Sequence, residues 1–211
     1  MNASIREQIC AIGRRIYQNG FAAANDGNIS VRCGDYVITT PTGVSKGFMQ
    51  PEMLAEVSLS GELLSGQIPP SSELKMHLRV YRERPDVRAV VHAHPPYATA
   101  FAVVGRVPDQ PIIAEAVVSV GPVALAPYAT PSTPGVAESI APLLAEHDAI
   151  LLANHGALTY AADLETAYFR MESLEFYAKL TLLSSQIGDP RPLSPAQVEE
   201  LQALRRRMRT K

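Results

Sequence analysis

A short strand that ends in two histidines constrains this chain more than any other segment. Residues 87–91 predict a buried strand, which is followed by His92 and His94 and is then broken by Pro95 and Pro96. In an extended chain, the side chains at positions i and i+2 leave on the same face. His92 and His94 can therefore aim their imidazole rings at one point and supply two ligands to one metal ion, provided that the fold brings a third ligand to the strand end.

Alternating helical and β-rich segments surround this strand. Amphipathic or capped helices are expected over residues 5–19, 72–83, 96–105, 133–147 and 164–187, and a last helix begins after residue 194. Short strands are expected within residues 27–32, 35–43, 53–66, 148–153 and 156–160, and segment 107–134 predicts loops interleaved with short strands. This mixture predicts an α/β sandwich, with residues 1–211 as one domain and the helix from about residue 194 as a mobile lid.

The composition argues against several kinds of partner. A formal charge of -2 and a pI near 6.2 give no electrostatic reason to expect nucleic acid or an anionic membrane. The arginines at 205, 206, 207 and 209 predict a solvated helix end. The two cysteines, Cys10 and Cys33, suggest free thiols in a reducing compartment. Without a signal segment or a long apolar stretch, we expect a soluble, cytoplasmic protein with no membrane partner.

His155 is the candidate third ligand, because it too lies where an apolar strand gives way to glycine. Neutral imidazoles favour zinc, copper, nickel or iron over magnesium and calcium, and three protein ligands are typical of a catalytic metal site. A His-x-His pair alone more often consists of structural rings that bond to backbone groups than of metal ligands. His77 and His147 fall within expected helices and are interpreted as ordinary polar or partly buried residues.

The segment "PPSSE" predicts an anion site. Ser71 and Ser72 lie at the start of an expected helix, where unpaired N–H groups bind phosphate, although either serine can equally be an N-cap. The glycine turns of "GNISVR" and "TPTG" offer further N–H donors, or are simply turns. Glu73 comes next, and it is interpreted either as a favourable acid in the first helical turn or as a base beside a metal.

Seven ordered motifs resemble the class II aldolase and adducin-head family, most closely its L-fuculose-phosphate aldolases. They are "GNISVR", "TPTGVSKG", "PPSSELKMH", "VVHAHPPYATA", "APYATPSTP", "LLANHGALT" and "DLETAYFRMESLEFYAKL", and the resemblance extends from the first helix to about Leu193. It implies a three-layer α/β/α sandwich with a central, mainly antiparallel sheet. It also implies a homotetramer with active sites at subunit interfaces.

The resemblance also implies roles for individual residues. A zinc ion, replaceable by manganese or cobalt, is expected on His92, His94 and His155. Glu73 is expected to be the catalytic acid and base and a possible ligand of the resting metal. The substrate phosphate is expected to bind at Asn28, Thr42, Gly43, Ser71 and Ser72.

The activity implied is cleavage of a ketose 1-phosphate, such as L-fuculose 1-phosphate, to dihydroxyacetone phosphate and a short aldehyde. Breaking a carbon–carbon bond next to a carbonyl leaves an enediolate, whose charge a chelated cation stabilises. A carboxylate such as that of Glu73 can move protons to and from the enediolate carbon. A bound phosphate anchors the end of the substrate that does not react.

The chain departs from the L-fuculose-phosphate aldolases at two places. The tyrosine that reaches into the neighbouring active site falls within residues 112–114 and is absent, and the aromatic residue after "PYAT" is replaced by Pro131. Glu115 or Tyr128 can supply a proton instead, or can be structural. Related sugar-phosphate reactions therefore remain open: decarboxylation of 3-oxo-tetronate 4-phosphate, epimerisation of a pentulose 5-phosphate, or dehydration of methylthioribulose 1-phosphate. A non-catalytic, adducin-like scaffold is the alternative outside enzyme chemistry.

Overall fold

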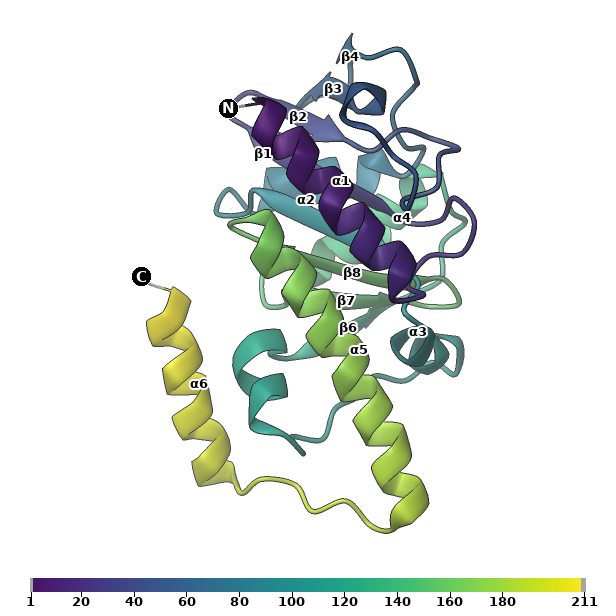
Figure 1. Ribbon diagram of the computed structural model, residues 1–211. Helices are drawn as coiled ribbons and strands as arrows, with labels where there is room; N and C mark the ends of the chain where they lie inside the picture. Colours follow the sequence, from purple (N-terminus) through teal and green to yellow (C-terminus); the bar gives the residue numbers. More distant parts are fainter. Residues whose placement is uncertain (1, 210–211) are drawn as a thin grey trace.

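The centre of the fold is one mixed β-sheet. A computed structural model describes residues 2–209 (Figure 1). The strands are β1 (Asn28–Cys33), β2 (Tyr36–Thr39), β3 (Ala55–Ser58), β4 (Leu63–Ser65), β5 (Ala89–Ala93), β6 (Val123–Ala126), β7 (Ala149–Leu152) and β8 (Gly156–Ala161). They form an eight-stranded sheet in the order β4-β3-β2-β1-β5-β8-β7-β6. Among the described strands, only β6 and β7 pair in parallel, which confirms the expectation of a mainly antiparallel sheet.

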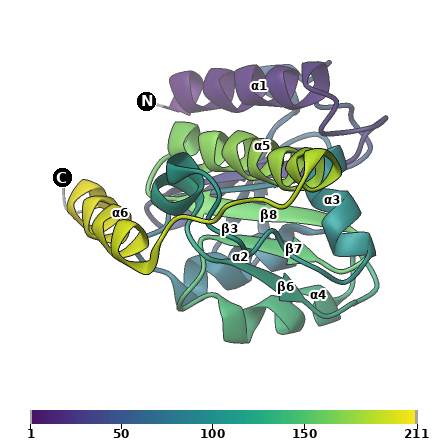
Figure 2. The same cartoon turned by 90° about the horizontal axis from the view of Figure 1, so that it is seen from below.

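Helices cover both faces of this sheet. The helices are α1 (Asn2–Gln18), α2 (Leu74–Glu83), α3 (Pro96–Val103), α4 (Pro134–Ile140), α5 (Leu164–Ile187) and α6 (Pro195–Arg209). Residues of α1, α3 and α5 form one apolar core with the sheet, and residues of α2 and α4 form a second core on the opposite face. Figure 2 shows α1 and α5 on one side of the strands and α4 on the other. The expected three-layer α/β/α sandwich is therefore confirmed.

The apolar stripes seen in the sequence determine which helix faces are buried. Ile9, Ile12 and Ile16 of α1 are all buried against the first core. On α5 the buried stripe consists of Ala167, Met171, Leu174 and Ala178 at helical spacing. The central strands β5, β7 and β8 are buried along their whole length, because helices cover them from both sides.

Several local expectations were wrong. Segment 107–134 contains one strand, β6, and a single π-helical turn over Ala116–Val120 instead of several strands. The helix after Thr133 ends at Ile140, because Pro142 lacks the N–H that would continue the ladder; a 3-10 turn, Ala141–Leu143, follows. His147 therefore lies beyond the helix in which it was expected.

The expected N-cap serines are not N-caps. Glu73 occupies the N-cap position of α2 without a capping hydrogen bond from its side chain, and the Ser71 hydroxyl accepts a hydrogen bond from the Glu73 N–H at 3.3 Å. The chain makes a turn over residues 71–73 before the helix begins, which leaves the serines one step outside the helix. His77 does lie on α2, where it is buried and its Nδ1 atom is 2.7 Å from the hydroxyl of Ser30.

After α5, an extended connection leads to the last helix, α6 (Figure 1). Helix α6 packs against the π-helical turn. Arg205 donates to the carbonyl of Val118 at 2.8 Å and to the buried carboxylate of Asp148 at 2.7 Å. The prediction of a solvated arginine cluster is therefore wrong for Arg205, whereas Arg206 and Arg207 are exposed. The side chain of Arg209 lies outside the described residues. Across residues 2–209, none of the helices has the length and apolar character needed to cross a membrane.

Glu175 of α5 caps the start of α3, the helix that follows the histidine strand. Its carboxylate accepts hydrogen bonds from the N–H groups of Tyr97 and Ala98 at 2.9 and 2.8 Å. Glu175→Ala leaves both donors unpaired, one buried and one partly buried, so we expect a loss of about 1–3 kcal/mol in the free energy of unfolding. Urea denaturation measures this loss. Glu175→Gln, which keeps one acceptor oxygen, should lose less, and equal losses in the two variants would contradict the capping role.

Candidate metal centre and active site

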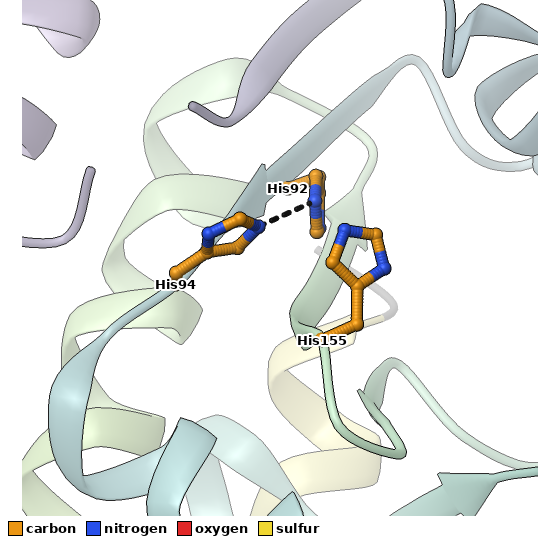
Figure 3. A group of neighbouring side chains, drawn as sticks. All are labelled: His92, His94 and His155. Carbon is orange, nitrogen blue, oxygen red and sulfur yellow. Dashed lines mark hydrogen bonds between the residues drawn. The ribbon is translucent and has the colours of Figure 1, made fainter. Parts of the chain in front are cut away.

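Strand pairing brings the three candidate histidines together. His92 lies on β5 opposite Leu158 of β8, and His94 directly follows β5. His155 lies in the turn between β7 and β8, just after Asn154, whose left-handed backbone (φ +56°) reverses the chain. Figure 3 shows the three rings facing one another from these two strand ends. Their ring centroids are 4.7–5.1 Å apart, and one nitrogen from each ring lies within 4.8 Å of the others.

A hydrogen bond behind His92 and a carboxylate near His94 orient two of the rings so that their Nε2 atoms face the common point. The Nδ1 atom of His92 lies 2.9 Å from the carbonyl oxygen of Ala157 and donates a hydrogen bond to it. The other ring nitrogen, Nε2, is therefore the one available to ligate a metal. The Nδ1 atom of His94 lies 3.5 Å from the carboxylate of Asp26, and its Nε2 is 3.2 Å from that of His92. A carbonyl or carboxylate behind a ligand histidine is the usual arrangement around a protein-bound metal.

The carboxylate of Glu73 lies between the rings. One oxygen is 3.2 Å from Nε2 of His92, and the other is 3.3 Å from Nε2 of His155. The Asn28 side-chain amide donates to the carboxylate at 3.0 Å. Two ligands of a tetrahedral zinc ion, each about 2.0–2.1 Å from it, lie about 3.3 Å apart, which matches these spacings. The residues present therefore fit a zinc-sized ion with nitrogen ligands and one adjacent carboxylate.

The protonation states of these groups suit a cation. Burial, followed by the neighbouring His92, lowers the pKa of His94 and of His155 to about 4, so both rings are neutral at pH 7. Burial alone would raise the pKa of Glu73, but the imidazoles of His92 and His155 and the Asn28 amide outweigh it and hold this pKa well below its usual range. An anionic carboxylate beside the neutral rings of His94 and His155 is a set of ligands that zinc binds without displacing protons from them.

A cavity of about 310 Å³ opens onto this cluster. Glu73, His94 and His155 line its walls. So does every residue expected to bind phosphate: Asn28, Thr42, Gly43, Ser71 and Ser72. His92 is fully buried behind the cavity. The N–H groups of Gly43 and Ser72 donate to no other group within residues 2–209, so both can serve a ligand. Larger hollows of about 450 and 580 Å³ lie beside α6 and contain none of the three histidines.

The sequence did not predict four further residues of this cavity: Asn25, Asp26, Lys46 and Ser132. Ser132 bonds to the hydroxyl of Ser72 at 2.7 Å and has a left-handed backbone (φ +65°), which is rare for serine. Asp26 and Lys46 belong to the same loops as the expected phosphate residues. Their closeness in sequence to Asn28 and Gly43 was the one feature from which their place in the cavity could have been predicted.

Glu115 and Tyr128, which were considered as proton donors in place of the missing tyrosine, do not line the cavity within this chain. Tyr128 and Glu115 are exposed, and neither they nor residues 112–114 line its walls. Pro131, which takes the place of the missing aromatic residue, does line it.

The family model described as the Class II Aldolase and Adducin N-terminal domain matches residues 7–182. The chain belongs to the class II aldolase and adducin family. The resemblance inferred from the seven motifs is confirmed.

Individual members of the class II aldolase family are similar over almost the whole chain. The 5-deoxy-D-ribulose 1-phosphate aldolase of Bacillus thuringiensis serovar kurstaki is 35% identical over 93% of this chain and 92% of its own length. A 3-oxo-tetronate 4-phosphate decarboxylase of Cupriavidus necator is 36% identical over 84% of this chain and 83% of its own. The solved structure of an L-fuculose 1-phosphate aldolase superposes with a TM-score of 0.89 at 28% identity, covering 95% of each chain. These relatives include both aldolases and decarboxylases of phosphorylated sugars.

Gly156 leaves the space that the histidine rings occupy. A Cβ atom there would lie 2.5 Å from Cδ2 of His94 and 2.6 Å from the carbonyl oxygen of Ala93. Gly156→Ala should therefore displace a ring and lower zinc affinity about tenfold or more, measured by competition with a chromogenic chelator. Gly188→Ala, where a Cβ atom meets nothing within 4 Å, is the matched control. Unchanged zinc affinity in Gly156→Ala would contradict a zinc site on these rings.

The pKa values of the histidines predict how the metal-free protein responds to acid. His94 and His155 have a pKa of about 4 when folded and about 6.5 when unfolded, so the unfolded chain binds more protons between these values. Their contribution to stability is complete above pH 6.5 and is lost as the pH falls from 6.5 towards 4. Urea denaturation of chelator-treated protein across this range should show the decline, and His155→Gln should make it shallower. The lowered pKa of Glu73 acts in the same direction, but only below about pH 4.5.

Proposed function

We propose that this protein is a zinc-dependent lyase that cleaves a ketose 1-phosphate to dihydroxyacetone phosphate and a short aldehyde. The observation that carries the proposal is the position of Glu73, which contacts two of the three clustered imidazoles, those of His92 and His155, and lines a cavity that also carries hydroxyl and N–H groups. A metal site, a proton carrier and an anion site in one cavity of about 310 Å³ are the parts that such a reaction needs.

In this proposal His92, His94 and His155 hold the metal, with manganese or cobalt as possible substitutes for zinc. A divalent ion bound there supplies a Lewis acid that stabilises the negative charge developing beside the substrate carbonyl, which is worth several kcal/mol. The hydrogen bond from His92 to Ala157 and the proximity of Asp26 to His94 keep the two rings oriented, so little reorganisation accompanies binding.

The phosphate end of the substrate binds to the hydroxyl and N–H groups of the cavity wall. Ser71, Ser72 and Thr42 supply hydroxyls, Gly43 supplies a backbone N–H, and Asn28 completes the set. Because Gly43 has a left-handed backbone (φ +70°), its N–H can approach an anion without steric conflict from a side chain. Binding energy from this non-reacting end orients the bond that breaks.

Glu73 carries the proton. Its carboxylate is ionised and partly buried, and the Asn28 amide holds it in place. In this ionised form it can remove a proton from the carbon beside the substrate carbonyl; in the cleavage direction it must first take up a proton, which it then delivers to that carbon.

Decarboxylation of a phosphorylated 3-oxo acid is a second candidate. Loss of carbon dioxide from such an acid leaves the same charge beside the same carbonyl, so the metal, phosphate and proton-carrying residues serve it equally well. A specific observation favours it: an aldol cleavage needs a proton exchange with the aldehyde oxygen, and neither Glu115 nor Tyr128 lines the cavity in this chain. The 36% identity to the Cupriavidus necator decarboxylase supports the same alternative.

A substrate panel tests the proposal and separates the candidates. The zinc-loaded protein is incubated with 5-deoxy-D-ribulose 1-phosphate, L-fuculose 1-phosphate, a pentulose 5-phosphate, methylthioribulose 1-phosphate and 3-oxo-tetronate 4-phosphate. Dihydroxyacetone phosphate, carbon dioxide, epimers and dehydration products are assayed in parallel. We expect dihydroxyacetone phosphate from a ketose 1-phosphate and loss of activity after chelation. Carbon dioxide alone would favour the second candidate, and a protein with neither turnover nor bound metal would favour the adducin-like scaffold.

Glu73→Gln should retain zinc and lose most activity. The amide keeps the shape of the carboxylate and one oxygen that can ligate the metal, but it cannot accept and release the proton of the substrate carbon. We therefore expect turnover to fall by about 10²–10⁴-fold. Metal analysis and steady-state kinetics on the same sample measure both effects. Full activity in this variant would refute the role of Glu73, and Glu172→Gln, on α5 and away from the cavity, is the matched control.

We also propose that the protein is a cytoplasmic homotetramer with active sites at subunit interfaces. Exposed apolar residues on the second half of α5, including Phe176, Leu183 and Ile187, support burial against another subunit. The free thiols of Cys10 and Cys33 support a reducing compartment. Residues 1–211 are proposed to act as one domain, with α6 as a mobile cover.

A further inference from the structure

A lysine is buried in the wall of the active-site cavity. The side chain of Lys46 is 1% exposed, and it is the only lysine or arginine among the described residues that line this cavity. Charged ammonium groups are seldom buried without a partner, because removing the charge from water is costly. The position of Lys46 therefore calls for a physical reason.

The ammonium group connects the two loops that carry the expected phosphate residues. Its Nζ atom donates to the carbonyl of Val44 at 2.6 Å and to the carbonyl of Asn25 at 2.9 Å. Val44 directly follows Gly43, and the loop of Asn25 leads into Asn28. The charge of Lys46 is thus fixed behind the part of the cavity where an anion is expected.

The two carbonyls leave the ammonium charge without a full partner. An ammonium group has three N–H donors, and only two are matched by acceptors within residues 2–209. Asp26 is near enough to favour the charged form, but no carboxylate of the described chain lies within 4.0 Å of Nζ. Burial outweighs Asp26 and lowers the pKa of Lys46 to about 8. A bound anion would complete this environment.

We propose that Lys46 is the counter-charge for the phosphate group of the substrate and determines the preference of the cavity for phosphorylated ligands. This inference rests on the proposed function, in which a sugar phosphate occupies the cavity. The charges on its walls explain why one cation matters: Asp26 and Glu73 are acidic, so without Lys46 a dianionic phosphate would meet two carboxylates and only one compensating metal site. Lys46 also holds the Asn25 and Gly43 loops at a fixed separation, which keeps the neutral donors in place.

Lys46→Met tests this role, because methionine fills a similar volume without the charge. Calorimetric titration of the zinc-loaded, full-length protein with inorganic phosphate should show affinity weakened about tenfold or more. With the phosphorylated substrate found in the panel, KM should rise by a similar factor, kcat should change less than about threefold, and zinc content should stay at the wild-type value. With the unphosphorylated counterpart of that substrate, the two proteins should perform alike. Lys75→Met, which removes an exposed lysine two residues after Glu73, is the control and should bind phosphate normally.

Two outcomes would overturn the proposal. Unchanged phosphate affinity in Lys46→Met would show that the charge does not meet the anion. Loss of zinc together with phosphate would show that Lys46 only supports the fold of the loops. Both outcomes concern Lys46 alone and leave open whether the wild-type protein cleaves a substrate. Conversely, a wild-type protein that binds phosphate through Lys46 but turns over no substrate would refute the proposed reaction and not the role of Lys46.

The wild-type protein offers a second measurement in case Lys46→Met does not fold. The Nζ resonance of Lys46, assigned in protein labelled with ¹⁵N-lysine, is followed across pH with and without inorganic phosphate. Phosphate should raise the pKa of Lys46 above about 8, because a bound anion favours the ammonium form. Asp26, Glu73, His94 and His155 line the same cavity, and they are present in both arms of the comparison. An unchanged titration at saturating phosphate would overturn the proposal without any substitution.

Discussion

The antiparallel pairing of β5 with β8 is the constraint on which the candidate active site depends. It places His92 opposite Leu158 and brings the end of β5 beside the turn that carries His155. Because side chains alternate along a strand, a shift of one residue would turn His92 to the opposite face of the sheet. Apolar residues buried on both faces of β5 and β8 prevent that shift. The same packing that stabilises the sheet therefore fixes the positions of the imidazoles.

Periodicity in the sequence predicted the local parts of this arrangement but not their assembly. The i, i+2 spacing placed His92 and His94 on one face, and the helical stripe of α5 was read correctly, since both depend only on neighbours in the chain. The meeting with His155 depends on pairing between distant strands, which no local pattern specifies, and the expectation rested on the family resemblance. Arg205 shows the same limit, because its partner Asp148 lies far away in the sequence and its burial could not be read from a basic tail.

Loops supply the residues that the sequence did not reveal. Asp26, Lys46 and Ser132 lie in three separate loops that meet only around the cavity. Ser132 adopts a left-handed backbone that costs about 1–2 kcal/mol for a residue other than glycine, and such strain is typical of ligand sites. Its hydroxyl contact with Ser72 ties the loop before α4 to the expected phosphate site. The candidate metal ligands thus lie at the ends of strands of the sheet, whereas Asp26, Lys46 and Ser132 of the cavity wall lie in loops.

The most direct test of this account is a crystal structure of the zinc-loaded protein with diffraction data collected on both sides of the zinc absorption edge. If the three imidazoles hold zinc, one strong anomalous peak per chain is expected, about 2.0–2.1 Å from a nitrogen of each of His92, His94 and His155. A peak held by other side chains, or three rings without a metal at saturating zinc, would contradict it.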